Sequence, residues 1–191
     1  MLLLVVALIV PAFGARPGFT STGNLEWRDC GIGDSWMSVK KFDISPNPVV
    51  LPGDITVTLE GEITHDLANQ VTMDVLMEKK LLGTFIKVPC TTTGGSVGTC
   101  HYTDPCHCLN FFKHSGTCPP FLTANGLPCT CPFNPDKLSL PASKFTVTGI
   151  NRAWKLVLED SEYHVKITVN EKPSGQLRGC LEVYLNINVK Q

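Results

Sequence analysis

Residues 54–63 read DITVTLEGEI, and apolar side chains, with one glycine, occupy every second position of this stretch. A period of two places these side chains on one face of an extended chain, so the stretch predicts a half-buried β-strand. The same alternation recurs in residues 71–77, 163–169 and 181–189. Shorter alternating pieces lie at residues 42–44 and 145–147, and residues 79–88 predict a hairpin that turns around Gly83. Hairpin-length connections join several of these strands, which favours an all-β fold with mostly antiparallel pairing.

Five or six such strands predict two sheets that pack face to face with aliphatic inner faces, an antiparallel β-sandwich. If the sheets are parted, they enclose an apolar pocket. A lipid chain would be stabilised in such a pocket, because each buried methylene group contributes about 0.8 kcal/mol. The pattern therefore indicates a lipid-sized apolar cavity.

The middle of the chain has a different composition. Residues 89–143 contain seven of the nine cysteines and eight of the 14 prolines, and only residues 109–114 predict a short helix. A stretch of this length without regular structure is expected only where it is covalently stapled or functional. We predict a disulfide-stapled loop region at residues 89–143 within a single domain that spans residues 16–191.

The first residues of the chain predict the cellular compartment of the protein. Residues 1–13 read MLLLVVALIVPAF, and small residues follow where a signal peptidase needs them, which predicts a signal peptide over residues 1–15 that is cut after Gly14 or Ala15. The alternative is a membrane anchor, but a span needs about 20 apolar residues. We expect a protein of the secretory pathway, lysosomal or extracellular, in which disulfides form.

Charge and motifs exclude several classes of protein. With 16 basic and 17 acidic residues the formal net charge is −1, which argues against binding to nucleic acid. The sequence contains no nucleophile elbow, phosphate-binding loop or zinc-protease motif. The acidic cluster at residues 159–162 predicts a solvated turn rather than paired catalytic carboxylates, and His164 is either exposed or an ordinary hydrogen-bonded histidine. We expect neither catalysis nor a cofactor.

Cysteine and histidine neighbours raise the alternative of a metal site. Cys106-His107-Cys108 and Cys129-Thr130-Cys131 supply zinc-ligand types. Their one-residue gaps do not fit the usual spacing, and secretion favours oxidation. We therefore expect structural disulfides and no metal. One of the nine cysteines must remain outside these disulfides, and the number of possible connectivities leaves the pairing of the others open.

A set of motifs in the second half carries a family likeness. These motifs are KVPC at residues 87–90, GLPCTCPF at residues 126–133, SLP at residues 139–141, and the cysteines at positions 100, 106, 118 and 180. Together they closely resemble the ganglioside activators, a branch of the ML-type lipid-recognition family, from about Trp27 to Val189. The resemblance implies a β-cup, which is an antiparallel β-sandwich opened around an apolar cavity.

The same resemblance implies a function. Such a protein is not an enzyme; it lifts a glycosphingolipid from a membrane, presents it to a lysosomal β-hexosaminidase, and transfers other lipids such as phospholipids. Bound lipid is then its only ligand, and its contact with the membrane surface is transient. The alternative is a secreted lipid-recognition or carrier protein of the same fold without a hydrolase partner.

Site residues follow from the resemblance and from composition. The implied disulfides are Cys30–Cys180, Cys90–Cys100, Cys106–Cys131 and Cys118–Cys129. Cys108 is then the odd thiol, free or capped, with a covalent dimer as the alternative. The expected lipid-binding residues are Tyr163, which matches a ligand-contacting tyrosine of the family, and the loop phenylalanines Phe111, Phe112 and Phe121.

Two apolar loops predict membrane docking. The first contributes Leu81, Leu82 and Phe85, and the second, residues 150–158, contributes Trp154, Leu156, Val157 and Leu158 beside Arg152 and Lys155. Apolar side chains with a basic flank suit a bilayer interface. The alternative for the second loop is a further strand of the core.

Overall fold

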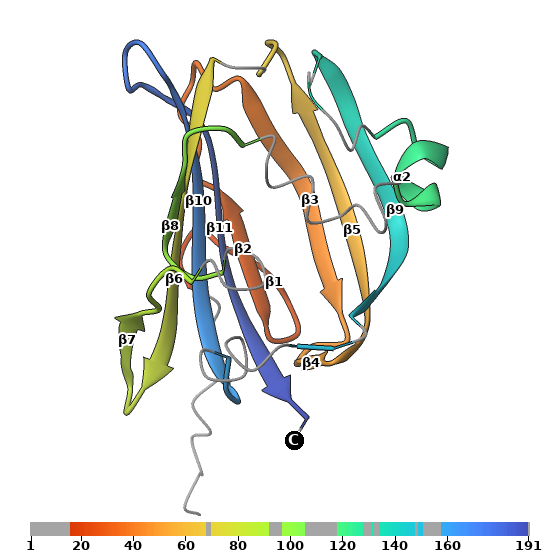
Figure 1. The fold of residues 1–191 in the computed structure, drawn as a ribbon, viewed down its shortest axis with the longest axis vertical. Coiled ribbons are helices and arrows are strands. Elements are labelled where there is room, and N and C mark those ends of the chain that lie inside the picture. Colours follow the sequence, from red (N-terminus) through yellow and green to blue (C-terminus); the bar gives the residue numbers. More distant parts are fainter. Residues whose placement is uncertain are drawn as a thin grey trace, which may run out of the picture.

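The computed structural model describes residues 16–67, 70–91, 97–105, 118–127, 131, 134–147, 149–150 and 158–190. Two β-sheets make up most of this part of the chain (Figure 1). The larger sheet contains, in spatial order, β1 (Thr20–Thr22), β2 (Leu25–Asp29), β11 (Leu177–Val189), β10 (Ser161–Glu171), β6 (Val71–Leu81) and β7 (Thr84–Lys87), with β4 (Val49–Leu51) beside β11 and β8 (Cys100–Tyr102) beside β6. The smaller sheet contains β3 (Met37–Ser45), β5 (Gly53–Ile63) and β9 (Asp136–Val147).

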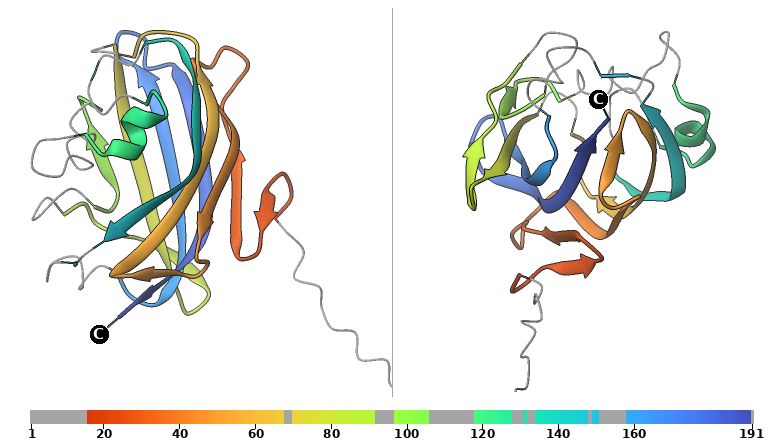
Figure 2. Two further views of the ribbon diagram at one scale, coloured as in Figure 1. Left: turned by 90° about the vertical axis from the view of Figure 1, so that its right-hand side faces the viewer. Right: turned by 90° about the horizontal axis from the view of Figure 1, so that it is seen from below.

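The two sheets face each other as the layers of a sandwich, and the β1–β2 hairpin projects at one side (Figure 2). Strand pairings among the described residues are antiparallel, except that β4 runs parallel to β11. The expected antiparallel β-sandwich is therefore confirmed. No described helix is long and apolar enough to cross a membrane.

Each stretch with a period of two forms a strand. Residues 54–63 lie in β5, and the other alternating stretches lie in β6, β10 and β11. The predicted turn at Gly83 joins β6 to β7, with Leu82 at φ 50° and Gly83 at φ 86°. Two successive residues with positive φ suit the right-handed twist of a two-residue hairpin.

Two described parts of the predicted loop region are strands. Strand β8 lies within it and pairs with β6. Residues 136–143 begin β9, which pairs with β5 along its length, so the prediction of irregular structure over all of residues 89–143 is wrong. Pro141 argues against a strand because it cannot donate a backbone hydrogen bond, but β9 is an edge strand and its register shifts opposite Val57–Leu59. Edges and bulges are where strands accept proline.

A short helix also lies in this region, at α2 (Pro120–Ala124). Proline is tolerated in the first turn of a helix because its missing N–H has no partner there, so Pro120 can begin this one. The helix predicted at residues 109–114 and the signal peptide at residues 1–15 lie outside the described residues.

Three buried apolar clusters hold the two sheets together. The first lies at the end of the sandwich where β4 runs and comprises Val49, Leu51, Met77, Val88, Leu158, Tyr163 and Ile187. The second lies at the other end and comprises Trp36, Ile63, Leu67, Val71 and Val169. The third joins β2 to β3 along one side and comprises Leu25, Trp27 and Val183, with the partly buried Val39 and Phe42 packed against it. The sandwich is thus closed at both ends and on one side.

Two of the implied disulfides are present, Cys30–Cys180 and Cys90–Cys100. Cys118 and Cys131 are also disulfide-bonded. The cysteines that the resemblance assigns as their partners, Cys129 and Cys106, lie outside the described residues, as does Cys108.

Candidate functional site

The middle of the sandwich is packed less tightly than its ends. Along the inner face of β10, Tyr163 is 0% exposed and Val169 is 7% exposed, whereas Val165 and Ile167 between them are only half-buried. The register places Val165 beside Met77 and Ile167 beside Val75 on β6. Solvent therefore reaches apolar side chains near the centre of the inner face but not at its ends.

The neighbouring strands show the same difference in side-chain exposure between their ends and their centre. On β6, Val71 and Met77 are buried while Met73 and Val75 between them are half-buried. On β5, Ile63 is buried in the second cluster, whereas three residues of the same face remain half-buried, namely Ile55, Val57 and Leu59. Apolar groups left accessible between two sheets can bind an apolar ligand, because the ligand removes their surface from water.

Tyr163 belongs to the closed end of the sandwich. Its hydroxyl donates a hydrogen bond to the backbone oxygen of Glu159 at 3.0 Å and accepts one from the Glu159 backbone N–H at 2.9 Å. Burial raises the pKa of the Tyr163 phenol, so the hydroxyl stays protonated. The structure thus gives Tyr163 a packing role, with no ring surface exposed in this state.

The first predicted docking loop is the β6–β7 hairpin. Leu82 at its tip is 98% exposed and Leu81 is 50% exposed. Phe85 instead is half-buried and packs edge-on against Tyr184, with ring centroids 5.6 Å apart. Phe85 therefore anchors the hairpin to the outer face of the larger sheet, and the two leucines extend beyond it.

The second predicted docking loop is described only in part. Leu158 is 3% exposed and lies in the first core cluster, so this burial places it in the core rather than on a docking surface. Trp154, Leu156 and Val157 lie outside the described residues.

Phe121 is the one expected lipid-binding phenylalanine within the described residues, since Phe111 and Phe112 lie outside them. Its ring packs edge-on against Phe145 of β9, with centroids 4.5 Å apart. Phe145 is directly opposite Ile55 in the register, and directly opposite residues share a face of the sheet. Helix α2 therefore meets the small sheet beside its inner face.

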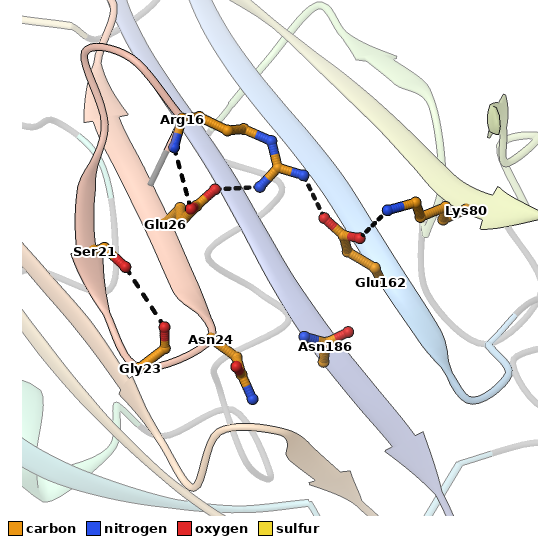
Figure 3. Close-up of a pocket in the computed structure, with 8 residues that line it drawn as sticks. All are labelled: Arg16, Ser21, Gly23, Asn24, Glu26, Lys80, Glu162 and Asn186. Atoms are coloured by element: carbon orange, nitrogen blue, oxygen red, sulfur yellow. Dashed lines mark hydrogen bonds and ion pairs between the residues drawn. The ribbon is translucent and has the colours of Figure 1, made fainter. Parts of the chain in front are cut away.

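The outer face of the larger sheet carries a polar groove of about 450 Å³ (Figure 3). Arg16 hydrogen-bonds Glu26 of β2 and Glu162 of β10, and Glu162 also accepts a hydrogen bond from Lys80 of β6 at 2.7 Å. Two cations and two carboxylates thus pair with one another, and they link residue 16 directly to β2 and β10 and, through Glu162, to β6. The prediction of a solvated turn at residues 159–162 is wrong for Glu162, and sequence spacing could not reveal its partners because they lie on distant strands.

His164 lies in a second charged group on the same face. It is 8% exposed, and its two ring nitrogens contact Glu78 and Glu182, so it is a hydrogen-bonded histidine, one of the two expected possibilities. Among the described residues no group of three or more histidine, cysteine, aspartate or glutamate side chains is arranged to hold a metal ion.

Comparison with known proteins gives a consistent result. The ganglioside GM2 activator of Mus musculus is 30% identical over 95% of this chain and 91% of its own length, and that of Macaca fascicularis is 28% identical over 88% of this chain and 86% of its own. A crystal structure of a Niemann-Pick type C2 protein from the Japanese carpenter ant aligns over 85% of this chain and 98% of that one at 14% identity and a TM-score of 0.43, which is too low to add to the assignment. The family profile described as ML domain matches residues 24–187. This chain therefore belongs to the ML-domain family.

Proposed function

We propose that this protein is a non-enzymatic lipid-transfer protein. It takes the acyl chains of a membrane lipid, a glycosphingolipid in the first place, into the space between its two sheets. The observation that carries the proposal is the half-buried apolar centre of the inner face, flanked by fully buried ends on β6 and β10. The names of the curated relatives, ganglioside GM2 activators, support a ganglioside-like ligand.

Membrane contact occurs through the tip of the β6–β7 hairpin. Leu81 and Leu82 are the most exposed of the large apolar side chains of this hairpin, ahead of Ile86, and Lys80 and Lys87 flank them. Apolar side chains enter the headgroup region while lysines remain at its surface, which suits transient binding to a bilayer. The second part of the docking surface, at Trp154, Leu156 and Val157, is proposed from the sequence alone.

The protein then presents the lipid headgroup to a β-hexosaminidase in the lysosome, which it reaches through the secretory pathway after loss of residues 1–15. The word activator in the relatives' names supports this step. The alternative, a secreted carrier of the same fold, shares the lipid site but needs no hydrolase.

A vesicle assay tests the first part of the proposal, the transfer of a lipid between membranes. A fluorescent ganglioside should move from donor to acceptor vesicles at a rate proportional to protein concentration, and Ile167→Asp should abolish transfer because it places a charge on the inner face. Thr56→Asp is the matched control, since Thr56 lies on the opposite face of β5 from Ile55 and Val57 and pairs with Lys144. No transfer by the wild-type protein would exclude the function.

A second arm adds β-hexosaminidase to ganglioside vesicles. Release of the terminal amino sugar that requires this protein supports presentation to the enzyme. Lipid transfer without any effect on the hydrolase would leave the carrier as the function.

A further inference from the structure

His164 is a buried titratable group that belongs neither to the apolar interior nor to the exposed tip of the β6–β7 hairpin. It lies on the outer face of β10, with Nδ1 2.9 Å from a carboxylate oxygen of Glu78 on β6 and Nε2 2.8 Å from one of Glu182 on β11. One side chain therefore connects three adjacent strands of the larger sheet. These strands form one wall of the sandwich.

The contacts determine how many protons the ring carries. A neutral imidazole has one N–H group and one nitrogen lone pair, and a lone pair that faces a carboxylate oxygen is repelled by it. Burial raises the pKa of Glu182, but hydrogen bonds from Arg28 and His164 outweigh this effect and leave the pKa lowered, so Glu182 is ionised. The contact with ionised Glu182 is attractive only if Nε2 carries a proton, and a carboxylate at Glu78 then requires a second proton on Nδ1.

Charge balance leads to the same conclusion. Arg28 binds the second carboxylate oxygen of Glu182 through Nε at 2.7 Å and Nη2 at 2.6 Å. Two carboxylates and one guanidinium leave one negative charge, which an imidazolium cancels. Buried charges are stable only when they are balanced and hydrogen-bonded.

The other cations that the structure describes on this face do not bind the two carboxylates. Lys87 of β7 lies across from Glu78 in the register and makes no ion pair among the described residues. Arg16 lies over the Tyr184 ring and pairs with Glu26 and Glu162. Tyr184 of β11 stacks on the imidazole with centroids 4.4 Å apart, and Phe85 of β7 packs edge-on at 6.0 Å. On the same face, Lys80 is paired with Glu162. Lys166, across from Glu182 in the register, makes no ion pair within the described part of the chain.

We propose that His164 is a proton-operated clamp. The doubly protonated ring ties β6, β10 and β11 together, and loss of one proton releases it from one carboxylate. The clamp needs both ring protons, so its stabilisation is present in acid and is lost when one proton leaves as the pH rises. The clamp therefore stabilises the larger sheet in acid. This inference does not depend on the proposed function.

Nuclear magnetic resonance of the ring nitrogens tests the protonation state. At pH 7 both ring nitrogens of His164 should be protonated, and exposed His65, whose ring contacts the Thr64 hydroxyl and the Trp36 ring, serves as the internal comparison because no carboxylate contacts it among the described residues. An unprotonated ring nitrogen on His164 at pH 7 in the folded protein would overturn the proposal.

Amide hydrogen exchange tests whether the protonated ring stabilises the three strands that it joins. At pH 5, protection factors of amides in β6, β10 and β11 should fall roughly tenfold in His164→Gln, and the difference from wild type should vanish at pH 8.5. His65→Gln is the matched control and should change nothing. If His164→Gln does not fold, Glu78→Gln removes one carboxylate instead and should remove the pH dependence. Protection in the folded variant that matches wild type at pH 5 would contradict the clamp.

Discussion

Ile167 and Val169 share the inner face of β10 two residues apart, but only Val169 is buried. If the centre of the sandwich is open space, a larger side chain fits there and not at the end. Ile167→Trp should therefore leave the free energy of unfolding nearly unchanged, whereas Val169→Trp should lower it by about 1–3 kcal/mol, the usual cost of overpacking. Urea denaturation of both variants measures this, and equal losses would mean that the centre is a filled core.

Tyr163 offers a second test at the residue scale. Tyr163→Phe leaves both backbone groups of Glu159 without their partner and should lower the free energy of unfolding by about 1–3 kcal/mol. Lipid transfer by the folded variant should be unchanged, because the hydroxyl is fully engaged within the protein. A variant of normal stability with impaired transfer would instead assign Tyr163 to ligand contact.

The burial and the charged partners of single residues could be predicted from the sequence only in part. Alternation correctly placed Val165 and Ile167 on one face, but it could not show that both ends of that face are sealed while the centre is not. The charged partners of Glu162 and His164 come from strands far apart in sequence. Local pattern carries no information about such contacts.

At the scale of elements, the β6–β7 hairpin allows the docking proposal to be separated from folding. Leu82 is 98% exposed at φ 50°, a left-handed conformation that asparagine adopts more readily than leucine. Leu82→Asn should therefore keep or slightly raise the melting temperature while it weakens sedimentation with vesicles. Ile32→Asn is the control. Ile32 is 53% exposed and lies between β2 and β3, outside the β6–β7 hairpin, so its loss should not affect vesicle binding. An equal effect of both substitutions would argue against docking by the hairpin.

The long strands could be predicted from sequence because one of their faces is consistently apolar. β5, β6, β10 and β11 all lie where a period of two predicts them. The β1–β2 hairpin and β4 are short, at three to five residues each, and offer too few positions for a period to show. β9 was partly missed because Pro141 interrupts it at an edge.

At the scale of the molecule, Cys30–Cys180 joins residues separated by 150 positions. In the loop-entropy model, closure of so long a loop limits the unfolded chain and contributes about 4–5 kcal/mol. The double variant Cys30→Ser with Cys180→Ser should lose about that much stability in urea denaturation. The matched double variant at Cys90 and Cys100, a separation of 10, should lose less by this measure.

The central claim is that the centre of the sandwich holds a lipid, and native mass spectrometry tests it most directly. The purified protein, incubated with ganglioside-containing vesicles and then separated from them, should carry a mass increment equal to one lipid molecule. Ile167→Trp should lose that increment while it remains folded, because the indole occupies the lipid's space. A wild-type protein that remains free of lipid after incubation, or an Ile167→Trp protein that binds as much lipid as wild type, would contradict the account.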